Sequence, residues 1–363
     1  MKIRCTQFLK ATLLLILVSS LYSCRKDKDN EPEPEKTTGI FVLNEGGFNA
    51  NNSTLSYYDF LGANVTSDIY SAANSGAKLG DTGQDAIVYG NKMYISVNNS
   101  NKVDVLNIKT SKLIKSITMT IAGAAPAYPR FLESAKGKVF ISAYDDKVYV
   151  LDTLSLIMQK SIPVGRDPEQ MAIVGDKLYV ANSGGYGNYE NTVSIIDLNS
   201  LIELKKITVG INSNQVVADK YGDVYVVSRG DYGSTPANLY RINTSNDQVI
   251  AMNIPVTEMA INEDIAYIYK SNYNYGTNSY DKGYLTLNVN NETVGPSFIT
   301  DATDASIVLP YGIAVDPLSG DIFIADAKDY VNPGDVYCFG KDGKKKYTFK
   351  VGINPSKFVF YKK

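Results

Sequence analysis

The chain has 363 residues, with 36 Lys and Arg against 38 Asp and Glu, which gives a formal net charge of −2. This balance provides no electrostatic basis for binding nucleic acid, which proteins bind through clustered basic residues. The sequence contains no histidine, the commonest metal ligand and the commonest general acid or base. We therefore expect no metal centre, no catalytic residues and a function other than that of an enzyme.

The first residues follow the pattern of an export signal. A positively charged start precedes an apolar run over 11–20, shorter than the roughly 20 apolar residues that span a bilayer. Positions 21–24, Leu-Tyr-Ser-Cys, then resemble the lipobox of bacterial lipoproteins, although Tyr22 departs from the small residue usual there. The resemblance implies a signal peptide over 1–23 and a lipid on Cys24. The alternative is an ordinary secretory signal with an incidental cysteine.

The segment after the cysteine predicts a tether. Residues 25–36 contain no apolar side chain and are rich in proline and charge, so 24–36 is expected to be an extended, solvated linker. Its Lys, Asp and Glu cluster resembles the surface-export signal of Bacteroidetes lipoproteins. We expect a protein attached to the outer membrane through its N-terminal lipid and facing the cell exterior. Retention on the periplasmic side is the alternative.

One short pattern then recurs seven times and predicts the fold. A turn with Gly, Asn or Asp precedes a short apolar and aromatic strand, at positions 39–44, 91–97, 137–143, 176–182, 222–228, 264–270 and 320–326. The aligned aromatic residues lie about 47 residues apart on average, a spacing typical of four-stranded propeller blades. We expect them to pack between blades: Phe41, Tyr94, Phe140, Tyr179, Tyr225, Tyr267 and Phe323.

The two ends of the repeat region predict how the ring closes. The first repeat starts at its second strand, whereas the chain continues past the last full repeat with an extra apolar segment, 354–361. That segment matches the missing innermost strand, and adding it to the first blade would leave no open sheet edge. The predicted fold class is all-β, a seven-bladed β-propeller of four-stranded antiparallel blades over 37–363.

Long loops of shared composition are expected on one face of this ring. The loops after the second strands are rich in Tyr, Asn, Ser and Gly, as in 44–52, 183–190, 229–235, 271–280 and 327–332. The same composition characterises antibody paratopes, where Tyr supplies rigid contact area and the small polar residues supply hydrogen bonds. The alternative is that these residues merely decorate exposed loops.

Nearer the axis, polar residues enter most first strands. We expect these residues to surround the mouth of the central channel, where Asn44, Asn98, Asn182, Arg229 and Asp326 at the ends of the second strands would accompany them: Asp85, Arg130, Gln170, Gln215, Glu258, Gly312 and Lys357. The alternative is an ordinary water-filled channel lining. Asp145 with Asp146, or Asp326 with Asp329, could hold calcium through their oxygen atoms, but no loop has ordered calcium-ligand spacing.

Three sequence features carry a resemblance to a known family: Asn44-Glu45-Gly46, the segment 55–59 (Leu-Ser-Tyr-Tyr-Asp) and the segment 78–81 (Lys-Leu-Gly-Asp). With the repeats, they resemble the YncE-like propeller lipoproteins of Bacteroidetes, and within that group the BtuG-type proteins. That resemblance implies capture of a corrinoid, a vitamin B12-like molecule, as a transported ligand and not as a catalytic cofactor. It also implies a TonB-dependent outer-membrane transporter as partner.

The candidate ligand-binding residues are chosen from their position in the repeats alone. They are Asn44, Glu45, Phe48, Asn98, Tyr128, Arg130, Arg166, Gln170, Asn182, Tyr186, Tyr189, Gln215, Arg229, Tyr232, Tyr273, Tyr275 and Tyr330.

Two other functions stay open. A propeller of this kind could bind a surface glycan or a protein instead of a corrinoid. A propeller hydrolase such as a lactonase would need a calcium or zinc centre with convergent carboxylates on the axis, and Arg130 and Lys357 interrupt an acidic ring there.

Overall fold

The computed structural model describes residues 35–120, 125–274 and 276–362. The chain divides into two units, 1–36 and 37–363. The predicted signal peptide, Cys24 and Tyr275 lie outside the described residues. No helix in the described ranges has the length and apolar character needed to cross a bilayer.

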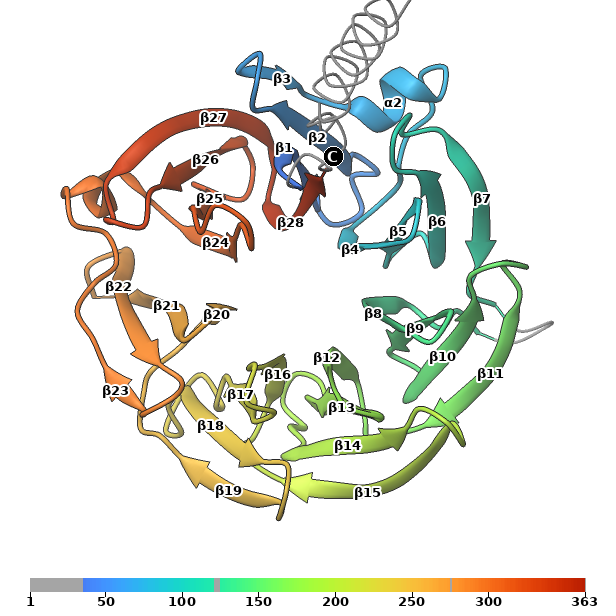
Figure 1. Ribbon diagram of the computed structural model, residues 1–363, viewed down its shortest axis with the longest axis vertical. Helices are drawn as coiled ribbons and strands as arrows, with labels where there is room; N and C mark the ends of the chain where they lie inside the picture. Colours follow the sequence, from blue (N-terminus) through green and yellow to red (C-terminus); the bar gives the residue numbers. More distant parts are fainter. Residues whose placement is uncertain (1–34, 121–124, 275, 363) are drawn as a thin grey trace, which may run out of the picture. The chain divides into compact units, whose positions relative to one another are not determined.

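Within the described ranges of the second unit, seven four-stranded antiparallel sheets form a ring, with each sheet radiating from the axis as one blade (Figure 1). Written from the innermost strand outward, blade one is β28 (Pro355–Lys362), β1 (Thr37–Asn44), β2 (Thr54–Asp59) and β3 (Asn64–Thr66), and blade two is β4 (Gly83–Tyr89), β5 (Lys92–Val97), β6 (Lys102–Asn107) and β7 (Leu113–Thr118). Blade three is β8 (Pro129–Ala135), β9 (Lys138–Ala143), β10 (Lys147–Asp152) and β11 (Met158–Pro163). Blade four is β12 (Pro168–Val174), β13 (Lys177–Asn182), β14 (Thr192–Asp197) and β15 (Ile202–Thr208).

Blades five to seven follow in chain order. They are β16 (Ser213–Ala218), β17 (Val224–Ser228), β18 (Asn238–Asn243), β19 (Gln248–Ala251); β20 (Glu258–Asn262), β21 (Ile265–Asn274), β22 (Ser279–Asn288), β23 (Thr293–Val294); and β24 (Pro310–Val315), β25 (Ile322–Asp326), β26 (Pro333–Phe339), β27 (Lys345–Ile353). A 3-10 helix, η1 (Thr303–Ser306), precedes β24.

The ring closes as predicted. β28 pairs antiparallel with β1, with Phe41 opposite Val359, so the C-terminal segment is the innermost strand of blade one. Consecutive inner strands contact one another around the ring, including β24 with β28 and β28 with β4. The Thr37 hydroxyl adds a 2.7 Å hydrogen bond to Asp316 of blade seven. Because the first and the last strand of the propeller belong to the same sheet, every inner strand has an inner strand of another blade on each side.

The core consists of apolar layers between successive blades. Each of the seven aligned aromatic residues belongs to a different layer, and six of them are fully buried, which confirms their predicted role. Tyr267 is half-buried and packs edge-on against Phe298, with ring centroids 5.5 Å apart. The second strands are buried on both faces because a blade lies on each side, whereas outer strands such as β7 and β15 are mostly exposed.

The short helix α2 (Ile69–Ala73) between β3 and β4 was not expected from the sequence. Asp68 caps its start by accepting a 3.1 Å hydrogen bond from the Ser71 amide. Tyr70 is buried, and its hydroxyl donates to Asp104 of blade two at 3.1 Å. A single turn of helix is too short to show apolar periodicity, and it is held by this contact with the next blade.

Candidate ligand-binding site

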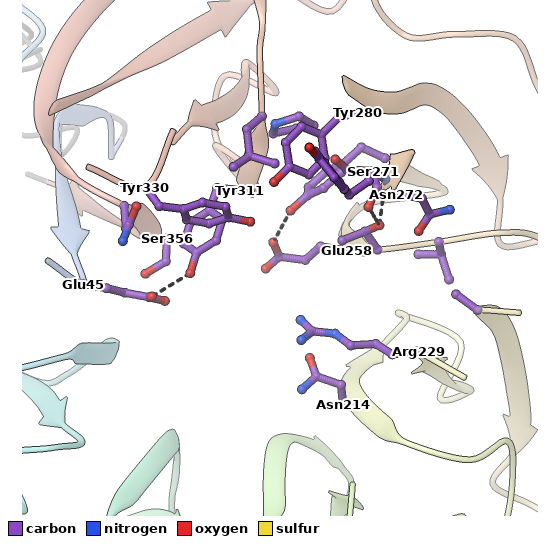
Figure 2. Close-up of a pocket in the computed structure, with 18 of the residues that line it drawn as sticks. Glu45, Asn214, Arg229, Glu258, Ser271, Asn272, Tyr280, Tyr311, Tyr330 and Ser356 are labelled. Atoms are coloured by element: carbon purple, nitrogen blue, oxygen red, sulfur yellow. Dashed lines mark hydrogen bonds between the residues drawn. The ribbon is translucent and has the colours of Figure 1, made fainter. Parts of the chain in front are cut away.

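A cavity of about 840 Å³ opens at the axis, on the face that carries the loops after the second strands. Residues from six blades line it, and Figure 2 shows 18 of the lining residues, ten of them labelled, around the central space. The two sides differ in chemistry. Blades six and seven contribute five tyrosines, and blades two, three and five contribute two amide and two cationic side chains with one tyrosine, Tyr232.

The aromatic side is built by an unusually long hairpin and the blade beside it. β21 and β22 each extend for ten residues, so most of the segment 271–280, expected as a loop, is paired strand. Tyr273 and Tyr280 lie opposite each other in this hairpin, with ring centroids 5.1 Å apart. Tyr311 and Tyr330 of blade seven meet edge to face at 5.7 Å. These four tyrosines, with Tyr269, form what we call the tyrosine wall.

Two tyrosines of the cavity are held in an uncommon backbone conformation. Tyr232 and Tyr330 have φ values of 57° and 65°, which non-glycine residues rarely adopt. Each follows an aspartate, Asp231 or Asp329, whose carboxylate accepts hydrogen bonds from backbone amides further along the same loop. These bonds hold the backbone of each turn in place, so the positions from which both side chains project are set before any ligand arrives.

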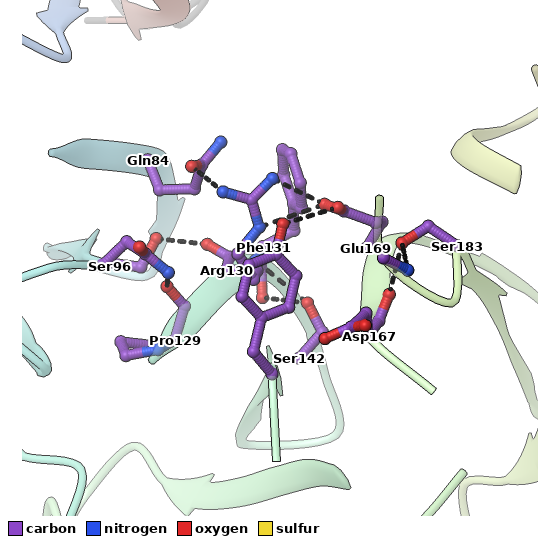
Figure 3. A network of polar contacts seen from close by, with 12 residues as sticks. Gln84, Ser96, Pro129, Arg130, Phe131, Ser142, Asp167, Glu169 and Ser183 are labelled. Atoms are coloured by element: carbon purple, nitrogen blue, oxygen red, sulfur yellow. Dashed lines mark hydrogen bonds and ion pairs between the residues drawn. The ribbon is translucent and has the colours of Figure 1, made fainter. Parts of the chain in front are cut away.

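The opposite side contains a buried polar network around Arg130 (Figure 3). Its guanidinium donates to Glu169 at 2.8 and 3.1 Å and to the Gln84 side chain. The Tyr144 hydroxyl donates to the other oxygen of Glu169 at 2.9 Å, and its ring lies 4.6 Å below the guanidinium carbon. The charge of Arg130 is thereby compensated inside the protein.

Two carboxylates face the cavity, and each accepts a hydrogen bond from a tyrosine. The Tyr311 hydroxyl donates to Glu45 at 2.7 Å, and the Tyr269 hydroxyl donates to Glu258 at 3.0 Å (Figure 2). Burial raises the pKa of Glu258 to about 7, although Lys357 and Tyr269 oppose the shift. Burial likewise raises the pKa of Glu45 above its usual value.

Arg229 enters the cavity from the end of β17 and lies next to Asn214 (Figure 2). Burial by itself would lower the pKa of Arg229, but Tyr232, Glu169 and Glu258 together raise it. Its Nε atom is buried without a hydrogen-bond partner.

The expected axial ring is only partly correct. Arg130, Glu258 and Lys357 line the cavity, but Asp85, Gln170, Gln215 and Gly312 do not. In their place, the residue one position earlier faces the cavity in three blades: Gln84, Asn214 and Tyr311. The inner strands β4, β16 and β24 each carry a register shift at this point, and a β-bulge re-aims the side chains beside it.

The displaced residues connect neighbouring blades. The Asp85 carboxylate accepts a 2.8 Å hydrogen bond from the Leu132 amide of blade three. Gln215 holds both backbone groups of Met259 in blade six, donating at 3.0 Å and accepting at 2.9 Å. At Gly312, a Cβ atom would lie 2.4 Å from the Ser356 carbonyl oxygen, so only glycine allows β24 and β28 to approach this closely.

The candidate residues chosen from the sequence divide into four groups. Lining the cavity are Glu45, Phe48, Arg130, Arg229, Tyr232, Tyr273 and Tyr330. Buried side chains that hydrogen bond within the propeller are Asn44, Asn98, Asn182 and Gln215. Not among the lining residues are Tyr128, Arg166, Gln170, Tyr186 and Tyr189. The fourth group is Tyr275, outside the described residues.

Two members of the third group still adjoin the cavity. Tyr189 meets both Tyr186 and Tyr232 edge to face, each with ring centroids 6.3 Å apart. Tyr186 is 91% exposed and Tyr232 is 66% exposed, so these three tyrosines lie at the rim of the cavity and not at its centre. Arg166 is paired with Glu190 and donates to the Asn188 carbonyl oxygen.

Five further residues line the cavity although the repeat pattern does not single them out: Gln84, Asn214, Tyr269, Tyr280 and Tyr311. Tyr280 belongs to a segment with the composition of a loop, and the β-bulges bring Gln84, Asn214 and Tyr311 to the cavity without a local sequence signal. A proline marks the start of four inner strands, at Pro129, Pro168, Pro310 and Pro355, but it does not show which of two successive side chains faces the cavity. In the described part of the chain, no three acidic or cysteine side chains gather as a metal site would require.

Solved structures share this architecture. A quinonprotein alcohol dehydrogenase-like protein from Bacteroides thetaiotaomicron is 17% identical, with a TM-score of 0.64 over 90% of this chain and 79% of that chain. Kuenenia stuttgartiensis hydrazine synthase is 16% identical, with a TM-score of 0.57 over 72% and 77%. U3-55K is 6% identical, with a TM-score of 0.55 over 76% and 84%. At such identities the likeness is one of fold alone.

None of the curated proteins matches this chain. A family model does match, over residues 38–361, which is almost the whole propeller. This seven-bladed propeller therefore belongs to the DUF5074 family, a domain of unknown function.

Proposed function

We propose that this protein captures a corrinoid in the axial cavity and passes it to a TonB-dependent outer-membrane transporter. The observation that carries the proposal is the asymmetry of the cavity, with the tyrosine wall on one side and amide and cationic side chains on the other. A corrinoid is a broad ring with apolar faces, an amide-rich edge and a nucleotide tail containing one phosphate. The apolar ring faces match the tyrosine wall, and the amide edge and phosphate match the side with amide and cationic side chains.

The dimensions are compatible with such a ligand. Protein cavities that bind small molecules have volumes of roughly 300–1,000 Å³, and this one, at about 840 Å³, is near the upper end of that range. A corrinoid would extend beyond the mouth, toward the exposed rings of Phe48, Tyr186 and Tyr232. Inside, Gln84 and Asn214 lie opposite the tyrosine wall and Asn272 belongs to the same hairpin as its tyrosines, and all three supply amide groups for the edge of the ring.

Preorganisation supports tight binding. The Tyr232 and Tyr330 loops are held by their aspartates, and Tyr273 and Tyr280 belong to a paired hairpin. Side chains that are already ordered lose little conformational freedom on binding. Because the chain has no histidine, it offers no imidazole to cobalt, so the corrinoid would keep its own lower ligand.

Binding is tested by calorimetry with cyanocobalamin and the propeller. Tyr280→Ala removes a ring from the tyrosine wall and is expected to weaken binding by about 2 kcal/mol. Tyr221→Ala is the matched control, because Tyr221 is exposed in the turn between β16 and β17, on the opposite face. Binding that is absent, or that both variants weaken equally, contradicts the proposal. Binding of an oligosaccharide instead would favour the glycan-binding alternative.

The proposed location is the outer membrane, through a lipid on Cys24. Cys24→Ala is expected to release the protein from the membrane fraction, and the wild type is expected to be cleaved when protease is added to intact cells. A wild-type protein that external protease cannot reach would contradict surface exposure. Co-purification of the lipidated protein with a TonB-dependent transporter tests the proposed partner.

A further inference from the structure

Three cationic side chains line the cavity, and two of them are paired with carboxylates. Arg130 lies 2.8 Å from Glu169, and the Lys357 Nζ atom lies 3.6 Å from Asp85. Among the described residues, no carboxylate lies within 4 Å of the third, Arg229. Arg229 is therefore the cation of this cavity whose charge is least compensated by the protein.

The surroundings of Arg229 are those of a group prepared for a ligand. The side chain is half-buried, and its Nε–H has no hydrogen-bond partner, which in a buried environment is unfavourable unless something else supplies one. The Asn214 side chain lies beside the guanidinium and points the same way into the cavity (Figure 2). Tyr232, from the adjoining loop, also lines the cavity and helps to raise the pKa of Arg229.

The carboxylates across the cavity do not satisfy this arginine. Glu258 and Glu45 act on Arg229 through space, but each accepts its hydrogen bond from a tyrosine, Tyr269 or Tyr311. In Figure 2 the central space separates both from the guanidinium. A ligand entering that space reaches Arg229 without first displacing an ion pair.

We propose that Arg229, together with the Asn214 amide, forms an oxyanion subsite that binds a phosphate or carboxylate group of the captured ligand. A guanidinium presents several N–H donors in a planar fork that matches such a group, and charge-assisted bonds of this type are the strong ones. The subsite rests on the proposed function in one respect: in a corrinoid, the phosphate of the nucleotide tail is the group that it would bind.

The test compares two corrinoids that differ in that tail, cyanocobalamin and dicyanocobinamide, which lacks the nucleotide and its phosphodiester. Arg229→Gln is expected to weaken cyanocobalamin binding by roughly tenfold or more, because a hydrogen bond to a charged group is lost. The same variant is expected to bind cobinamide as the wild type does. Arg241→Gln is the control, since Arg241 belongs to the same blade and is paired with Asp223 and Glu292, outside the cavity.

Other outcomes separate the two proposals. Equal losses for both corrinoids, or no loss for either, would overturn the oxyanion subsite while leaving corrinoid capture intact. If the wild type binds neither corrinoid, the proposed function fails and inorganic phosphate becomes the probe, against chloride at matched ionic strength. Phosphate should then raise the melting temperature of the wild type and of Arg241→Gln, but not of Arg229→Gln. An equal response of all three proteins would overturn the subsite as well.

Discussion

The Tyr311 hydroxyl of blade seven donates a 2.7 Å hydrogen bond to the Glu45 carboxylate of blade one. The bond crosses the junction at which the ring closes, next to the backbone hydrogen bonds from Glu45 to Asn354 and from Gly46 to Ile353, the last residue of β27. It also keeps a carboxylate in place at the edge of the cavity. One contact thus serves both the closure of the ring and the geometry of the site.

We predict that Tyr311→Phe costs about 1–3 kcal/mol of stability at neutral pH, because the partly buried Glu45 carboxylate loses its donor. The bond favours the ionised form of Glu45, so the pKa of Glu45 should rise further in the variant. The cost should therefore be larger in alkaline than in acidic buffer. Urea unfolding at several pH values measures it.

Tyr337→Phe is the control for this effect. The Tyr337 hydroxyl also lies in blade seven but donates to a neutral acceptor, the Ser306 carbonyl oxygen, at 3.3 Å. Its loss should cost about the same at every pH. A pH-independent cost for Tyr311→Phe would show that the bond does not act on the ionisation of Glu45.

Removal of residues 352–363 should abolish cooperative unfolding of the propeller. The deletion takes away β28, the inner strand of blade one, together with its contacts to β4 and β24. Circular dichroism during heating measures the transition. Adding a synthetic peptide of residues 352–363 should restore the cooperative transition, because β28 pairs with β1, to which it is not adjacent in the chain. A truncated protein that melts like the wild type would contradict closure by this strand.

Gln215→Ala should destabilise the propeller by about 2–3 kcal/mol, because it leaves the buried amide and carbonyl of Met259 without partners. The folded fraction should still bind ligand with nearly unchanged affinity, since Gln215 is not part of the cavity lining. Gln248→Ala, on the exposed outer strand β19, is the control and should change stability by less than about 0.5 kcal/mol. If Gln215→Ala instead loses affinity for the ligand while its stability is unchanged, Gln215 would be part of the binding site.

Glu258→Gln should alter the pH dependence of stability. In the folded protein burial raises the pKa of Glu258 from 4.5 to about 7, so the folded state binds the proton more tightly than the unfolded state. The wild type therefore loses stability as the pH rises between these two values, on the order of 3 kcal/mol for a shift of this size. The variant should lack this loss.

Relative to the wild type, Glu258→Gln should thus become more stable with rising pH and should match it in acid. Glu133, whose pKa burial also raises to about 7, should leave part of the pH dependence in the variant. Glu263→Gln, an exposed glutamate of the same blade, is the control and should leave the curve unchanged. If the stability difference between Glu258→Gln and the wild type is the same at every pH, the raised pKa of Glu258 is contradicted.

The sequence by itself determined the architecture. Each blade is built from strands adjacent in the chain, so its pattern of turns, apolar residues and one aromatic residue can be read locally, seven times over. Phe140 and Tyr179, for example, are buried between blades as their place in the repeat predicts. The extra C-terminal segment likewise predicted the closure with β1, because a strand without a partner in its own repeat needs an edge elsewhere.

The tertiary structure alone decided which side chains meet at the axis. A shift of one residue at a β-bulge exchanges Asn214 for Gln215 at the cavity and Tyr311 for Gly312, and nothing in the local pattern reveals such a shift. The same holds for the charges. The sequence does not distinguish Arg130 from Arg229. In the structure, Glu169 from the neighbouring blade compensates the charge of Arg130, whereas no carboxylate among the described residues contacts Arg229. Pairing of this kind depends on distances between blades, which exist only after the ring has closed.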